Sequence, residues 1–197
     1  MENRYIFKSW DDDWDHVYDI QGGSFRKLIE ACGKYCEYVS FWYSGVKDDK
    51  RQHYSDFAPF WVKVPEWGKR KFQSLSSILP ESMKAQSTLY DLYGADNYKR
   101  RVCFYKVCPE LLEIMLNNTD QLFTWYHDDD NPEDPTFYRS DGSVFLDTVV
   151  HDGQCVLSPR AGEDIREILS GETWETYDGP FPLQIFCDSW YFPESVE

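Results

Sequence analysis

Three β-type segments separated by Asp-Gly pairs constrain the fold more than any other feature of the sequence. The segments FYR, SVFLDTVV and QCVLS follow one another, with Asp141-Gly142 and Asp152-Gly153 between them. An Asp-Gly pair between two strands supplies the positive φ angles that a tight hairpin turn needs. Residues 136–158 are therefore predicted to form an antiparallel β-meander.

Two helices are predicted from the spacing of apolar residues. Through residues 24–37 apolar side chains recur every three or four positions, and Ser24 is a candidate N-cap. A second helix is predicted at residues 109–117, because Pro109 suits a first helical turn. A shorter helix is predicted within AGEDIREILSG. These helices do not alternate strictly with strands, so the expected class is α+β.

Further strands are predicted where aromatic and β-branched residues gather. They are YIFKSW, EYVSFWYSG, KRRVCFYKV and part of the tail GPFPLQIFCDSWYF. Together with the meander they predict a mostly antiparallel sheet with a β-meander, covered by the helices near residues 24–37 and 109–117.

The chain is long enough for a substantial core. It has 197 residues, 42% of them hydrophobic and 18% aromatic, which excludes a disordered chain. We expect a single α+β domain over residues 1–197. Pro59, Pro65 and Pro80 interrupt short apolar runs, so residues 47–98 are expected to form an irregular, decorated segment.

Charge is unevenly distributed along the chain. The net charge is −15, and residues 47–106 sum to +5 whereas residues 107–197 sum to −17. Nucleic acids and anionic membranes attract basic surfaces, so neither is an expected partner. No apolar run is long enough to cross a bilayer. We expect a strongly dipolar fold unless the two regions interleave. The expected partner is a basic protein.

Six cysteines are spread over the chain, and the first residues do not show the pattern of a secretory signal. A cytoplasmic protein with reduced thiols is expected. Cys32 and Cys36 fall within the apolar stripe of their predicted helix, so buried thiols are favoured over a zinc site. We expect no metal and no cofactor.

An acidic, aromatic stretch near residue 130 is the predicted binding site. Neither it nor residues 11–22 has the glycine and glutamate that a calcium-binding EF-hand loop requires. Aromatic anchors with an acidic rim suit a basic partner. The predicted binding residues are Trp125, Tyr126, Asp128, Asp129, Asp130, Glu133, Asp134 and Tyr138. The alternative is that Trp125 and Phe137 belong to the core and that only the loop is solvated.

A weaker catalytic candidate is the pair formed by His151 and Asp147. The two residues are four apart on one predicted strand and would share a sheet face, as a general base with its carboxylate or as two metal ligands. Alternatively, His151 is exposed or hydrogen-bonded to the adjoining turn. Motifs for a serine nucleophile or for phosphate binding are absent from the sequence.

Three segments of the sequence are FYKVCPELLEIML, LFTWYHDDDNPEDPTFYRSDGSVFLDTVVHDG and SFRKLIEACGKYCEYVSFWY. They resemble a family of uncharacterised bacterial proteins, some of which carry an automatic stage III sporulation name. The matching positions are Trp125, Pro132, Glu133, Asp134, Phe137, Tyr138 and His151. The resemblance covers about two thirds of the chain and implies no activity.

Two functional classes follow from the sequence. The first is a non-catalytic, acidic interaction protein, such as an immunity-type inhibitor or a regulatory partner, that binds a basic protein surface. The second is a small hydrolase or metal-dependent enzyme that uses His151 with nearby carboxylates.

Overall fold

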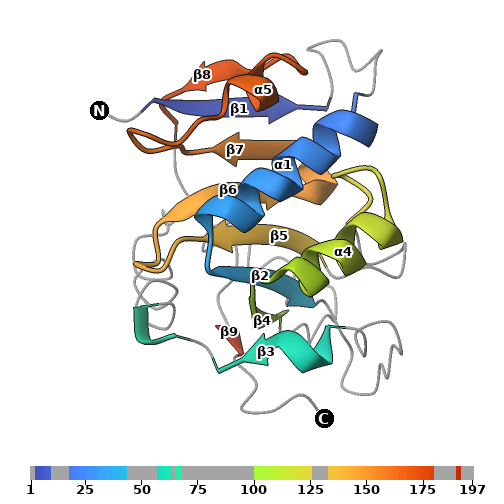
Figure 1. Cartoon of the computed structure of the whole chain (residues 1–197), viewed down its shortest axis with the longest axis vertical. Coiled ribbons are helices and arrows are strands. Elements are labelled where there is room, and N and C mark those ends of the chain that lie inside the picture. Colours follow the sequence, from blue (N-terminus) through green and yellow to red (C-terminus); the bar gives the residue numbers. More distant parts are fainter. Residues whose placement is uncertain are drawn as a thin grey trace, which may run out of the picture.

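The computed structural model describes residues 3–9, 18–43, 57–63, 65–67, 100–125, 133–179 and 190–191. Within these residues nine strands form one sheet, and three α-helices lie together on one of its faces (Figure 1). The strands are β1 (Arg4–Lys8), β2 (Tyr38–Tyr43), β3 (Trp61–Val62), β4 (Arg100–Lys106), β5 (Glu133–Tyr138), β6 (Val144–Val149), β7 (Gln154–Leu157), β8 (Glu175–Tyr177) and β9 (Trp190–Tyr191).

The order of the strands is β3-β4-β2-β5-β6-β7-β1-β8. Every neighbouring pair in this order is antiparallel, and β9 pairs parallel with β4. The predicted α+β class with a mostly antiparallel sheet is therefore confirmed. The predicted meander is also confirmed, as β5, β6 and β7. Gly142 (φ 82°) and Gly153 (φ 55°) supply the left-handed backbone of its two turns.

The two predicted long helices are present as α1 (Gly22–Tyr35) and α4 (Pro109–Asn118). The prediction that Ser24 caps α1 is wrong, because the N-cap is Gln21 and it makes no side-chain capping bond. Gln21 forms an isolated β-bridge with Gln121, and the Gly22 N–H donates to the Asp120 carbonyl. A tertiary contact thus starts the helix earlier than the local capping signal indicates.

The predictions for the short helix, for the tail strand and for residues 47–98 are confirmed only in outline. The short helix predicted within AGEDIREILSG is present as α5, which spans only Arg166–Leu169. Two residues of the tail form β9, and the rest of that predicted strand lies outside the described residues. Of the irregular segment at residues 47–98, the described part holds the 3-10 helix η2 (Ala58–Phe60) and β3.

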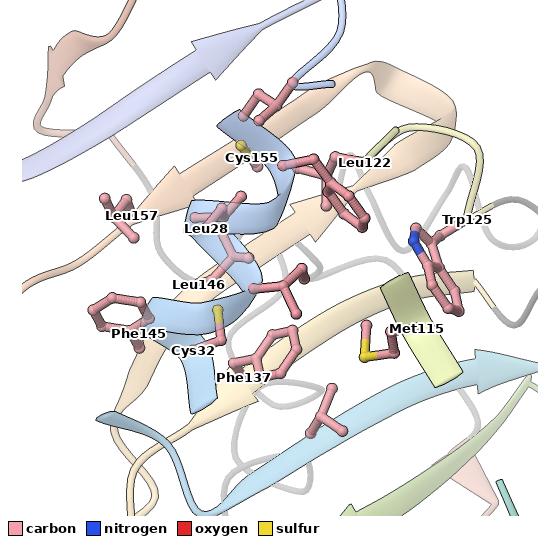
Figure 2. Packing of buried hydrophobic residues seen from close by; sticks show 14 of the residues in the cluster. Leu28, Cys32, Met115, Leu122, Trp125, Phe137, Phe145, Leu146, Cys155 and Leu157 are labelled. Atoms are coloured by element: carbon pink, nitrogen blue, oxygen red, sulfur yellow. The ribbon is translucent and has the colours of Figure 1, made fainter. Parts of the chain in front are cut away.

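The main core lies between the helices and the sheet (Figure 2). Leu28 and Cys32 of α1 and Met115 of α4 face this core and are completely buried. On the sheet, a register shift in the β5–β6 pairing places Phe145 as an extra residue in β6. The bulge allows the successive residues Phe145 and Leu146 both to enter the same core, where a regular strand would send one of them to the other face.

The opposite face of the sheet is buried as well. Cross-strand partners share a face, which places Ile6, Val156 and Asp147 together on this side, each no more than 5% exposed. Trp67 packs here against the rings of Tyr138 and Phe104, with ring centroids 5.0 and 5.7 Å apart. The central strands therefore have little solvent contact on either face.

The strand order places most strands of the acidic part of the chain away from those of the basic part, although β9 pairs with β4. The described strands of residues 47–106, β3 and β4, lie toward one edge of the sheet. Residues 133–177 supply β5 to β8 toward the other edge, interrupted only by β1. Among the described residues there is no helix long and apolar enough to span a membrane.

Candidate functional site

Trp125 lies inside the protein and is not a surface anchor. Its side chain is fully buried, stacked on Phe41 with ring centroids 5.5 Å apart and edge-on to Phe57 at 6.1 Å. Phe137 is also fully buried, so the alternative that Trp125 and Phe137 belong to the core is confirmed. A side chain without solvent exposure cannot contact a partner on the folded surface.

Glu133 and Asp134 likewise point away from solvent, at 5% and 1% exposure. They begin β5, which pairs with β2 in the middle of the sheet. Asp134 adopts a left-handed φ of 53°, and its Oδ1 accepts the Val150 N–H at 2.6 Å. This carboxylate therefore holds the end of β6 onto the start of β5. The other predicted loop residues, Tyr126, Asp128, Asp129 and Asp130, lie outside the described residues.

Tyr138 belongs to a buried polar network on the second face of the sheet. Its hydroxyl is 3.1 Å from the Ser40 Oγ, and the Thr136 Oγ1 donates to the Asp147 Oδ1 at 3.0 Å. All four side chains are at most 3% exposed. Burial raises the pKa of Tyr138 well above its usual value, against the opposing effect of its hydrogen bond with Ser40. The phenol therefore stays protonated at neutral pH and cannot act as a base.

The prediction that His151 and Asp147 share one strand is wrong. β6 ends at Val149, and His151 lies in the following 3-10 helix η4 (Val150–Asp152). The chain leaves the sheet there because the Val150 N–H turns to the Asp134 carboxylate. The two candidates are therefore not related by strand periodicity, and Asp147 is engaged with Thr136.

The thiols whose side chains the structure describes lie in the core or pack against it. Cys32 and Cys155 are fully buried, and burial raises the pKa of each thiol far above the usual value for cysteine. Cys36, one helical turn from Cys32, also has a raised pKa, chiefly through burial. Thiols that resist ionisation are poor nucleophiles and poor ligands. Among the described residues, no three His, Cys, Asp or Glu side chains meet in a possible metal site.

A buried ion pair at the β5–β6 turn was not anticipated from the sequence. Arg139, whose side chain is 7% exposed, donates from Nε and NH2 to the two carboxylate oxygens of Glu163 at 2.7 and 2.5 Å. The other guanidinium N–H groups reach the carbonyls of Val144 and Ser158 and the Ser143 Oγ. Arg139 is the last residue of FYR and lies 24 residues from Glu163, so the sequence gives no local signal for this pairing.

All three basic side chains of residues 107–197 are arginines that pair with nearby acids. Besides Arg139, Arg160 binds Asp141 at 2.6 Å and Arg166 binds Asp164 at 2.7 Å. Residues 133–179 contain eleven Asp and Glu against these three arginines. The acids therefore remain in excess over the arginines of their own segment.

Several of these acids lie near α5 and β8, on a surface that we call the acidic end: Glu167, Glu172, Glu175 and Asp178. Glu167 approaches Lys27 at 3.5 Å, and Glu175 approaches Lys8 at 4.0 Å. Their carboxylates are 82% and 67% exposed. Exposed pairs of this kind contribute about 0–1 kcal/mol, so these carboxylates can exchange partners readily.

An open groove of about 660 Å³ lies between α1 and α4. Its lining combines apolar side chains, such as Leu112 and Leu116, with Arg26 and Glu113 of opposite charge. These groups do not favour a ligand of one charge and include no acid–base pair of the kind that catalysis uses.

Comparison with known proteins gave no match, whether to a family model, to a curated protein or to a solved structure. The resemblance to an uncharacterised bacterial family therefore stays a prediction.

Proposed function

We propose that this chain is a non-catalytic, cytoplasmic binding protein of the immunity or regulatory type, which docks its acidic surface on a basic protein. The observation that carries the proposal is the local pairing of the three arginines of residues 107–197, each with an acid. In residues 133–179 eight more acids than basic side chains remain. An excess of one sign of charge attracts a partner of the other sign.

The acidic end is the described part of this surface. Glu167, Glu175 and Asp178 are exposed, and Glu172 is half-buried. The loop residues Tyr126, Asp128, Asp129 and Asp130 stay within the proposed surface as predicted from the sequence. The buried residues Trp125, Glu133, Asp134 and Tyr138 support the fold and do not belong to the surface.

Free thiols support the cytoplasmic part of the proposal. Cys32, Cys36, Cys108 and Cys155 are all unpaired by disulfides, which suits a reducing compartment. The alternative, a small enzyme using His151 and Asp147, gains no support from the described geometry, because Asp147 is buried and hydrogen-bonded to Thr136.

The test is a charge-removal experiment with a matched control. A basic protein partner is first isolated on the immobilised chain and identified, and its association rate is then measured at low and physiological salt. The triple variant Glu172→Gln, Glu175→Gln, Asp178→Asn removes three charges from the acidic end. The control Glu30→Gln, Glu113→Gln, Asp120→Asn removes three exposed charges on and beside the helices α1 and α4.

We expect the association rate to fall at least about tenfold for the first variant at low salt, within the range by which steering accelerates association. The control variant should lower the association rate only by the small amount that its reduced net charge causes. Equal rates for both variants and a rate that does not depend on salt would contradict the proposal.

A further inference from the structure

β8 is the outermost strand at the acidic edge of the sheet (Figure 1). It pairs antiparallel with β1 through the register Arg4↔Tyr177, Tyr5↔Thr176 and Ile6↔Glu175. Within the described ranges, no strand hydrogen-bonds to its other side. This edge differs from the opposite one, where β3 is followed by the exposed Lys63.

An edge strand offers backbone hydrogen bonds to an added strand. In an antiparallel ladder the N–H and C=O groups of successive residues point alternately to the two sides. Half of the pairing groups of β8 are therefore directed away from β1. Short strands with charged side chains are a common protection of such edges against unwanted pairing, and the same charges select which strand can pair.

We propose that the basic partner adds an extended segment to β8 as a further strand of the sheet; this inference rests on the proposed function and specifies how the partner binds. Residues 172–178 contain three acids and no Lys or Arg. Glu175 lies within β8 and Asp178 directly follows it. A strand with alternating lysines can place a cation opposite Glu175 on the same face of the sheet, and opposite charges stabilise cross-strand pairs.

The same charges exclude a second copy of this chain as the occupant. Pairing two β8 strands would bring together two segments that contain acids and no Lys or Arg, and like charges in cross-strand positions are destabilising. Each copy also carries a net charge of −15.

The cations beside β8 belong to its inner neighbour β1 and do not block the outer edge. The Arg4 guanidinium lies over the Tyr177 ring, 5.5 Å from its centroid. Lys8 is 4.0 Å from the Glu175 carboxylate, and both side chains are largely exposed. Because this contact is long and exposed to solvent, Glu175 can turn to a lysine on an added strand.

The experiment uses the full chain and a synthetic ten-residue peptide in which lysine alternates with valine. A second peptide has the same sequence but carries N-methyl groups on the amides of one edge, which removes hydrogen-bond donors and keeps the charge. Titration measures both affinities, and hydrogen exchange measures the protection of the amides of β8 in the complex. The triple variant of the acidic end and its control are measured in parallel.

We expect the unmodified peptide to bind the wild-type chain and the control variant, to slow exchange at one or more amides of Glu175–Tyr177, and to leave the Val62 amide of β3 unchanged. N-methylation should weaken binding roughly 5- to 30-fold, as expected for one or two hydrogen bonds. The triple variant should bind the unmodified peptide at least about tenfold more weakly.

Three results would overturn strand addition: no binding of the unmodified peptide, equal affinity for both peptides, or unchanged exchange in β8. If the association rate of the natural partner still depends on the acidic end in those cases, the proposed function survives and only the binding mode is wrong. If that rate is also insensitive, both proposals fail.

Discussion

Replacing Arg139 with methionine tests whether the buried ion pair holds the β5–β6 turn. The guanidinium makes two hydrogen bonds to Glu163, two to backbone carbonyls and one to the Ser143 hydroxyl. Its cationic carbon also lies 5.3 Å from the Phe145 ring centroid. Methionine keeps much of the apolar stem but leaves the Glu163 carboxylate, only 12% exposed, without its cation.

The expected cost is large for a single substitution. Removing one member of a buried ion pair typically destabilises by about 3–5 kcal/mol, because the remaining charge stays buried without compensation. For a chain of this length that corresponds to a fall in melting temperature of roughly 6–20 °C. Urea unfolding followed by circular dichroism gives the free energy directly. The double variant Arg139→Met, Glu163→Leu should be more stable than Arg139→Met alone, because it removes the orphaned carboxylate.

Arg160→Met is the matched control for this experiment. Arg160 also pairs with a carboxylate, Asp141, at 2.6 Å, but the two side chains are 39% and 53% exposed. An exposed pair contributes about 0–1 kcal/mol. If Arg139→Met costs no more than Arg160→Met, burial does not determine the strength of these pairs and the reasoning fails.

Three further outcomes are expected. Burial raises the pKa of Asp19 to about 6, against the opposing effect of the backbone hydrogen bonds that its carboxylate accepts. The Asp19 carboxylate therefore binds a proton more tightly in the folded chain than in the unfolded chain. Lowering the pH from 7.5 to 5 should therefore increase the free energy of unfolding, and Asp19→Asn should remove that increase in urea titrations. Gly142→Ala should destabilise by at least about 1 kcal/mol more than Gly162→Ala. Both glycines have positive φ, but only at position 142 would a Cβ meet another group, 2.4 Å from the Trp67 ring; equal melting temperatures would contradict this. Tyr138→Phe should lower stability by about 1 kcal/mol through loss of a buried hydrogen bond and leave the affinity for a basic partner unchanged in a titration.

Local signals were sufficient for most elements of the fold. The Asp-Gly pairs predicted the meander because a positive φ is a property of one residue and needs no knowledge of distant contacts. The spacing of Leu28 and Cys32 predicted the buried face of α1 for the same reason. The insertion of β1 between β7 and β8 could not be predicted, because pairing between strands about 150 residues apart leaves no local pattern.

The site prediction failed where an acidic residue was taken as evidence of exposure. Glu133 and Asp134 follow a run of aspartates and precede a proline, which is typical of a solvated loop. In the structure they start a central strand, and Asp134 is buried because its carboxylate satisfies the Val150 N–H. Buried polar groups are tolerated when they are hydrogen-bonded, and the partner here comes from a different turn.

The topology explains how a chain with so many acids can still present one acidic surface. The strands of the basic segment, β3 and β4, lie at the far edge from β8, so their cations are separated from the acidic end by the width of the sheet. Charges separated by more than about 10 Å in solvent are largely screened from one another at ordinary salt. The cations nearest to β8 are Arg4 and Lys8 of the neighbouring strand β1. Between β5 and β8, β1 is the one strand that does not come from residues 133–177. Replacing Lys8 with Gln should therefore increase the attraction of the acidic end for a basic peptide, and a weaker affinity of that variant would contradict this account.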